Sequence, residues 1–322
     1  MGSNVTNQQA EAASIKALSK FSDPEFTADG QRRAHVGMKG LDTLWFNTGT
    51  LCNLTCVNCY IESSPKNNRL VYLTLDEVTG YLDEIRDLDL PTTEIGITGG
   101  EPFMNPDIIG IMRLSLERGF KLLVLTNAMR PMMKCADELL ELKEKFGKQM
   151  VLRVSVDHFC RKMHEEERGA HSWEPMMKGL RWLAENGFSM DVAGRTRWGE
   201  EEAELRAGFA SLFEKHNITV DANSPKELVL FPEMDAELEV PEITTACWKI
   251  LNKSPSDIMC SSSRMVVKHK GDEKPSVMAC TLLAYDQQFN MGITLEEASR
   301  PVSLNHPHCA KFCVLGGGAC SA

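Results

Sequence analysis

Residues Leu51–Tyr60 read Leu-Cys-Asn-Leu-Thr-Cys-Val-Asn-Cys-Tyr and contain three of the chain's 11 cysteines. Cys52, Cys56 and Cys59, here called the cysteine triplet, follow the pattern Cys-x3-Cys-x2-Cys. Three thiolates this close along the chain can converge on one metal centre, and thiolates are the usual ligands of iron–sulfur clusters. A [4Fe–4S] cube normally takes four, so a triplet leaves one iron open. The alternatives are a disulfide framework and a zinc site, although zinc sites usually show two paired Cys/His modules.

The composition is that of an ordinary globular protein. The chain has 322 residues, of which 43% are hydrophobic and 25% charged, and its net charge is −10. This charge argues against nucleic acid and anionic membrane surfaces as partners. No apolar run predicts a transmembrane helix, and residues 1–20 lack the apolar core of a signal peptide. Eleven cysteines without an export signal favour metal ligation in a reducing compartment, so we expect a cytoplasmic protein.

Strand-like and helix-like segments alternate from residue 40 onward. Apolar runs predict strands over residues 42–48, 93–98, 121–126, 151–157, 189–196 and 227–231. Helical spacing predicts helices over residues 74–87, 107–117, 134–145, 173–186 and 200–216, the first with a capping box formed by Thr74 and Glu77. The alternation predicts an α/β fold with a parallel sheet and functional groups at the carboxyl ends of the strands. Periodicity alone leaves open whether the sheet closes into a barrel or stays open and doubly wound.

A second motif, Gly99-Gly100-Glu101-Pro102, follows the second predicted strand about 40 residues after the triplet. The two motifs, in this order and at successive strand ends, resemble those of the radical S-adenosylmethionine (SAM) superfamily. The resemblance covers roughly residues 40–231 and implies a partial (β/α)6 TIM-like barrel. It also implies that the triplet holds a [4Fe–4S] cluster whose open iron chelates SAM. An electron from a reductant such as flavodoxin or ferredoxin would cleave SAM, and the resulting 5′-deoxyadenosyl radical would abstract hydrogen from a substrate.

The resemblance also assigns SAM-binding residues. Gly99 and Gly100 would let the backbone approach the amino group of SAM, with Glu101 as an acceptor near it. Asn58 stands where much of the family has an aromatic residue near the adenine, and the aromatic Tyr60 follows the third cysteine. Asn58 could instead bind the adenine edge through its amide. Polar residues at later strand ends are expected to contact the ribose, the methionyl part or the carboxylate of SAM. They are Thr126, Asn127, Ser155, Asp157 and Arg195. Ser155 is preferred to Asp157, and a structural role is left open for Arg195.

Six cysteines lie beyond residue 232, and their arrangement is similar to the Twitch and SPASM extensions of radical SAM enzymes. Those extensions hold an auxiliary [4Fe–4S] cluster with a cysteine pair on a hairpin and a later pair. A hairpin is predicted over residues 265–270 and 274–279. Zinc held with His306 or His308 is the alternative, and Cys247 is a further candidate, as a cluster ligand or a catalytic residue. The expected cluster ligands are Cys260, Cys280, Cys309 and Cys313, with Cys320 as a rival for any of them.

We therefore expect a lead-in over residues 1–39, a radical SAM core over 40–231 and an auxiliary-cluster extension over 232–322. The expected function is hydrogen abstraction from an unidentified small molecule or peptide. The alternative is a non-catalytic iron–sulfur or zinc sensor or scaffold, which would have no need of an edge that binds an amino acid. The acidic segment 164–167 is expected to form a solvated face rather than a metal site.

Overall fold

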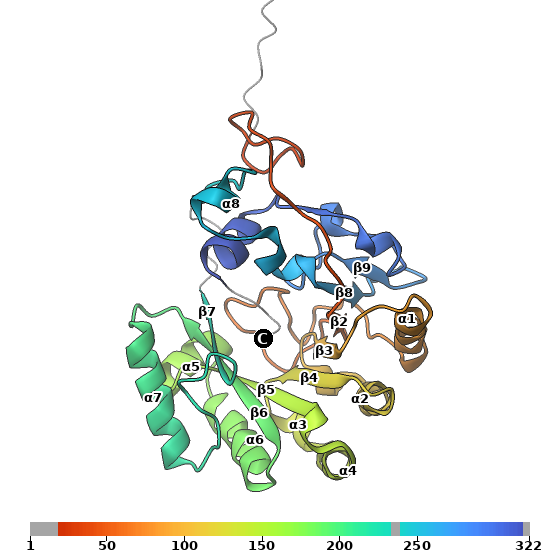
Figure 1. Cartoon of the computed structure of the whole chain (residues 1–322). Coiled ribbons are helices and arrows are strands. Elements are labelled where there is room, and N and C mark those ends of the chain that lie inside the picture. The colour runs from red at the N-terminus through yellow and green to blue at the C-terminus, as the bar shows by residue number, and fades with distance from the viewer. Residues whose placement is uncertain (1–18, 233–238, 318–322) are drawn as a thin grey trace, which may run out of the picture.

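One curved sheet organises the molecule (Figure 1). The computed structural model describes residues 19–232 and 239–317. Eight strands follow the order β7-β6-β5-β4-β3-β2-β8-β9. The six that were predicted pair in parallel with their neighbours in the chain, and together they form the expected partial barrel: β2 Thr43–Asn47, β3 Glu94–Thr98, β4 Lys121–Thr126, β5 Met150–Asp157, β6 Ser189–Thr196 and β7 Leu228–Pro232.

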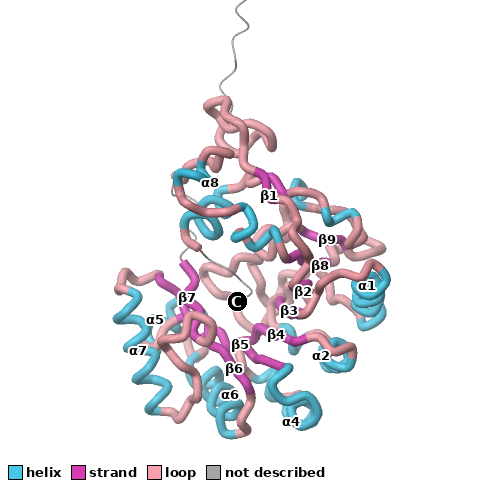
Figure 2. The backbone as a smooth tube through the Cα atoms, viewed as in Figure 1, coloured by secondary structure: helices cyan, strands magenta, loops and turns pink. Residues whose placement is uncertain are grey.

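Helices cover the outer face of this sheet (Figures 1 and 2). In the first, Thr74 and Glu77 form the predicted capping box, and residues at helical spacing, such as Val78 and Leu82, are buried. The outer helices are α1 Leu75–Asp87, α2 Ile108–Glu117, α4 Ala136–Phe146, α6 Trp173–Glu185 and α7 Glu202–Lys215. Three shorter helices are α3 Arg130–Met133, α5 Arg161–Arg168 and α8 Cys247–Ile250. No helix in the described ranges is long and apolar enough to cross a bilayer.

The C-terminal part of the chain continues the core sheet. Strand β8 (Ser263–Val267) pairs in parallel with β2, and β9 (Ser276–Met278) pairs antiparallel with β8, which confirms the predicted hairpin. Strand β1 (His35–Val36) pairs with β10 (Val302–Ser303) in a separate two-stranded sheet. The pairing of β2 with β8 joins the two parts of the chain on either side of residue 231 in one sheet. The domain boundary at residue 231 therefore stays a proposal.

The parallel arrangement fixes where a site can form. The carboxyl ends of parallel strands lie at one edge of the sheet, and the loops that follow them meet there. The cysteine triplet follows β2, the Gly-Gly-Glu-Pro motif follows β3, and Asn127 follows β4. The fold therefore brings together residues that are far apart in sequence.

Candidate functional site

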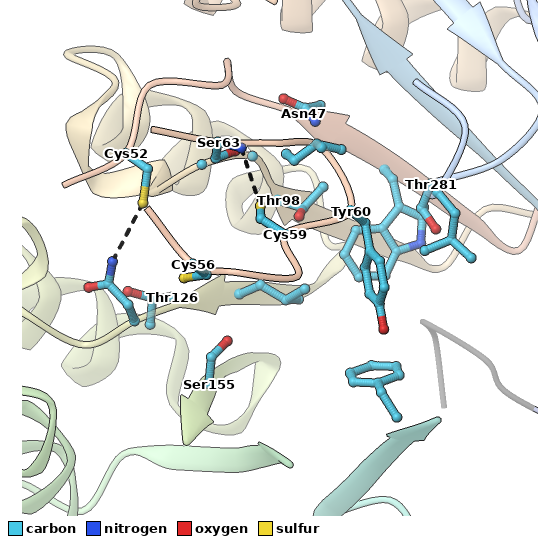
Figure 3. Close-up of a pocket in the computed structure, with 18 of the residues that line it drawn as sticks. Asn47, Cys52, Cys56, Cys59, Tyr60, Ser63, Thr98, Thr126, Ser155 and Thr281 are labelled. Atoms are coloured by element: carbon cyan, nitrogen blue, oxygen red, sulfur yellow. Dashed lines mark hydrogen bonds between the residues drawn. The ribbon is translucent and has the colours of Figure 1, made fainter. Parts of the chain in front are cut away.

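The principal cavity lies beside the cysteine triplet (Figure 3). All three cysteines line it. The Leu54 N–H donates to Cys52 Sγ at 3.4 Å, and the Ser63 N–H donates to Cys59 Sγ at 3.3 Å. Hydrogen bonds of this kind stabilise cluster-ligating thiolates and tune the cluster.

Burial disfavours the thiolate form of two cysteines of the triplet. Burial raises the pKa of Cys52 to about 12, and burial also raises the pKa of Cys56. Such thiols ionise when a metal binds them. Across residues 19–232 and 239–317, no three His, Cys, Asp or Glu side chains are close enough to share one metal ion. A cube bonds each thiolate to a different iron, so a cluster can be held by cysteines that do not converge on a single ion.

The Gly-Gly edge packs directly on the cysteine loop. The Gly100 N–H donates to Gly49 O at 2.8 Å, and the Glu101 N–H donates to Leu51 O at 3.1 Å. A Cβ on Gly100 would lie 2.3 Å from Leu51 O, and Gly99 has a φ of +148°. These glycines are therefore required by the approach of the loop backbone, in addition to the expected approach of a ligand, and both line the cavity.

Glu101 is buried, and its carboxylate is bound by other residues of the site. Its carboxylate accepts hydrogen bonds from Thr126 Oγ1 at 2.9 Å, the Asn127 N–H at 2.8 Å and the Phe103 N–H at 3.3 Å. Glu101 is not among the cavity-lining residues, whereas Thr126 and Asn127 are. The role of Glu101 in the structure is to tie the end of β3 to the end of β4.

Asn127 and Ser155 both line the cavity, and Figure 3 shows Ser155 beside the cysteine loop. The Asn127 side-chain amide donates to Asn53 Oδ1 at 2.9 Å and lies 4.0 Å from Cys52 Sγ. The β5–β6 register shifts between Ser155 and Asp157, and Asp157 has a φ of +58°. Such an irregularity redirects side chains at a strand end. Ser155 consequently lines the cavity while Asp157 does not, in agreement with the preference for Ser155.

Asp157 anchors two arginines that line the cavity. Arg168 pairs with it through Nε and through Nη2, the latter at 3.2 Å from Oδ1, and Arg195 Nε lies 3.3 Å from the same oxygen. Burial alone would raise the pKa of Asp157, but Arg168 and Arg195 outweigh it and hold that pKa below its usual value. Arg195 also lies over the Tyr60 ring at 5.1 Å. Sequence reasoning missed Arg168, because no motif marks it.

The expectation that residues 164–167 form a solvated face was wrong for two of them. His164 and Glu167 are fully buried. Glu167 accepts from the Asn58 N–H at 2.9 Å and from Asn58 Nδ2 at 3.0 Å, and it pairs with Arg197. Asn58 is thereby directed at Glu167 and does not line the cavity, so this structure gives it a partner other than adenine. The buried carboxylate holds the loop between Cys56 and Cys59.

A second, smaller cavity collects cysteines from the C-terminal part. Cys260 precedes β8 and Cys280 follows β9, so the antiparallel pairing places them at the same end of the hairpin. Cys309 and Cys313 lie on a π-helical segment, Cys309–Leu315. All four line the second cavity together with His308, whereas Cys247 does not. Cys320 lies outside the described residues.

Arg264 is a buried cation beside this second cavity. Its guanidinium donates to the carbonyls of Cys260 at 2.6 Å, Ser263 at 2.8 Å, Ala298 at 2.8 Å and Arg300 at 3.3 Å. In the described part of the chain it forms no ion pair with a carboxylate, and burial lowers the pKa of Arg264 to about 10. A buried charge of this kind calls for an anionic neighbour. A cube ligated by thiolates at Cys260 and Cys280 carries such a charge.

Comparison with known proteins gives sequence and structural relatives. AlbA of Bacillus subtilis, an antilisterial bacteriocin subtilosin biosynthesis protein, is 31% identical over 143 residues, which cover 44% of this chain and 30% of AlbA. The AdoMet-dependent heme synthase of Methanosarcina barkeri is 28% identical over 142 residues, which cover 44% of this chain and 38% of the synthase. The matches therefore span less than half the length of these relatives.

Among solved structures, SuiB of Streptococcus suis bound to S-adenosylmethionine shares the fold with a TM-score of 0.57 and 13% identity, over 79% of this chain and 63% of SuiB. Another structure holds SuiB with its precursor peptide SuiA. The model of the radical SAM superfamily matches residues 46–195, which contain both motifs and the ends of β2 to β6. Residues 46–195 of this chain therefore form a radical SAM domain.

Proposed function

We propose that the protein cleaves SAM reductively at a [4Fe–4S] cluster held by Cys52, Cys56 and Cys59. The observation that carries this proposal is the convergence of the triplet, the Gly99-Gly100 edge and Ser155 on one cavity. Three cysteines leave one iron available to SAM, and the bound pair supplies a 5′-deoxyadenosyl radical for hydrogen abstraction. The protein contributes the ligands, the orientation of SAM and an enclosed site.

The charged side chains suit the carboxylate end of SAM. Arg168 and Arg195 line the cavity on the side of Ser155, and Asp157 fixes both in place. Arg195 Nη1 is buried and has no hydrogen-bond partner in the described residues. An arginine donor that is held in place but left unpaired is suited to a carboxylate. We assign Ser155, Arg168 and Arg195 to that end, and Thr126 and Asn127 to neighbouring polar contacts.

The second cavity is assigned an auxiliary [4Fe–4S] cluster. Four cysteines from two segments line it, and the uncompensated charge of Arg264 favours an anionic centre there. Burial raises the pKa of Cys260 to about 11 and raises that of Cys309 as well, so cluster assembly has to release protons from these thiols. Cys260, Cys280, Cys309 and Cys313 are the proposed ligands.

The substrate is proposed to be a peptide, with a small molecule as the second candidate. AlbA acts in the biosynthesis of a bacteriocin, and SuiB has been solved with a precursor peptide. Flavodoxin or ferredoxin is the proposed source of the electron. AlbA extends well beyond the matched region, which covers 30% of its length.

The test is iron content together with product formation. Anaerobically reconstituted protein should hold about eight irons per chain, because two cubes carry four each. A variant with all three triplet cysteines changed to alanine should hold about four. With SAM and dithionite, the wild-type protein should form 5′-deoxyadenosine and the variant should not.

The alternative is a non-catalytic sensor that carries clusters but does not use SAM. Full iron content without 5′-deoxyadenosine would favour the sensor. Iron content that is unaffected by the triple change would refute the assignment of the first cluster. The cavity weakens the sensor hypothesis, because a sensor would have no need of Ser155 and two arginines on a cavity wall beside the cluster ligands.

A further inference from the structure

Three polar side chains that line the principal cavity have no hydrogen-bond partner in the described part of the chain. They are Trp45 through Nε1, Asn47 through Nδ2 and Ser63 through Oγ. Trp45 and Asn47 are fully buried, and Ser63 is 4% exposed. A buried donor without a partner costs about 1–3 kcal/mol, so such groups are rarely retained without a ligand or ordered water.

The two donors on β2 are held rigidly. Trp45 is opposite Gly96 in the β2–β3 register, and a Cβ on Gly96 would lie 2.4 Å from the indole ring. The absence of that Cβ lets the ring lie against β3. Asn47 Oδ1 accepts from the Gly49 N–H at 3.0 Å, which fixes the amide with its NH₂ group as the unpaired end. Both groups can therefore offer only N–H donors.

These donors are separated from the groups assigned to the SAM carboxylate. Asn47 lies on the side of the cavity opposite Ser155 (Figure 3). Strands β3 and β4 intervene between β2 and β5, so the two walls are three strand spacings apart, about 14 Å along the curved sheet. Trp45 precedes Asn47 by two residues and shares its face of the strand, deeper in the barrel. The region is open to a second ligand.

The charge of this wall selects the chemistry of that ligand. Indole N–H and amide NH₂ groups donate, so the ligand must present acceptor oxygens. The cations among the described cavity-lining residues are Arg168 and Arg195, which belong to the opposite side and pair with Asp157. A buried carboxylate without a cation would be costly, whereas a neutral carbonyl is matched by neutral donors.

We propose that Trp45, Asn47 and Ser63 form a substrate subsite that recognises a neutral amide carbonyl. This inference rests on the proposed function. It narrows the proposed substrate to compounds that carry an amide group, which include peptides and small amides. The hydroxyl of Ser63 can donate to a carbonyl or accept from an amide N–H of the same ligand. The apolar residues Leu125, Phe231 and Leu282 complete the cavity wall around such a group.

The test measures binding of a minimal probe to full-length, cluster-loaded protein with SAM. The probe is N-acetylglycine N-methylamide, a neutral diamide, and acetate is the charged comparison; saturation-transfer NMR gives the dissociation constants. Trp45→Phe keeps a ring against Gly96 but removes the N–H, and it should weaken diamide binding about 3- to 10-fold, the value of one hydrogen bond. Asn47→Asp keeps an oxygen that accepts from the Gly49 N–H but replaces the NH₂ donor with a second oxygen. It should weaken diamide binding at least as much as Trp45→Phe does.

Trp198→Phe is the matched control. Trp198 Nε1 is also buried and unpaired in the described residues, but Trp198 does not line the cavity, so its removal should leave diamide binding unchanged. The proposal would be overturned if acetate bound as tightly as the diamide, or if the diamide showed no saturable binding. It would also be overturned if Trp45→Phe bound the diamide like the wild-type protein, because the indole N–H would then bind only ordered water. Formation of 5′-deoxyadenosine by the wild-type samples tests the proposed function separately, because probe binding requires no cleavage.

Discussion

Glu167 connects helix α5 to the cysteine loop, and its conversion to glutamine should destabilise both. The carboxylate is fully buried and binds both amide groups of Asn58 as well as Arg197. Glu167→Gln keeps the size of the side chain but removes its charge and directs an NH₂ group at one of these donors. Removing one partner of a buried ion pair costs about 3–5 kcal/mol. Because Arg197 is partly exposed (24%), we expect about 2–3 kcal/mol here.

This loss corresponds to a fall in melting temperature of about 3–6 °C for a chain of this length. It should be measured by circular dichroism on anaerobically prepared protein, together with iron per chain. Asn58 lies between Cys56 and Cys59, so a loosened loop should also retain less iron in the first cluster.

Glu166→Gln is the matched control on the same helix. Its side chain is 51% exposed and its carboxylate lies 4.0 Å from Arg197, so its loss should change stability by no more than about 0.5 kcal/mol. If Glu167→Gln melts within about 1 °C of the wild-type protein, or no lower than Glu166→Gln, then Glu167 does not have the structural role assigned to it.

Two further predictions concern buried charge. In cofactor-free protein, burial raises the pKa of Glu101 from 4.5 to about 7, so the folded state retains a proton that the unfolded chain releases. The free energy of unfolding should therefore fall by about 3 kcal/mol as pH rises from 4.5 to 7. Urea titrations of Glu101→Gln should lack this dependence on pH. The same pH dependence in Glu101→Gln would contradict the assignment of the raised pKa to Glu101. Arg264→Met should lower the midpoint potential of the auxiliary cluster by roughly 50–100 mV in an EPR redox titration, because a nearby cation favours the reduced, more negative state. An unchanged potential would show that Arg264 does not compensate the cluster.

The sheet and its helices could be predicted because their signals are local. Strands that are buried on both faces appear as continuous apolar runs, as in Lys121–Thr126, and capping residues such as Thr74 mark where a helix begins. The convergence of the cysteine triplet and the Gly-Gly edge followed from the parallel topology alone.

The polar contacts of the site could not be predicted because they join distant residues. Glu167 and Asn58 are 109 residues apart, and the sequence of α5 shows only a charged segment. Arg168 is directed to the cavity by Asp157, whose position depends on the irregularity at the end of β5. Buried ion pairs leave no periodic pattern, so an acidic helix face that binds a loop is indistinguishable in sequence from a solvated one.

The positions of the two cavities favour one role for the auxiliary cluster. Leu282 lines both cavities, and Cys280 lies two residues before it, so the proposed second cluster would lie next to a residue that also borders the substrate region. Four cysteines line the second cavity, enough to occupy every iron of a cube. No iron would then remain for a substrate thiol, whereas an electron left on the substrate after hydrogen abstraction has only a short distance to cross. We infer that the auxiliary cluster accepts this electron in an oxidation, and its EPR signal should not change when a small thiol is added.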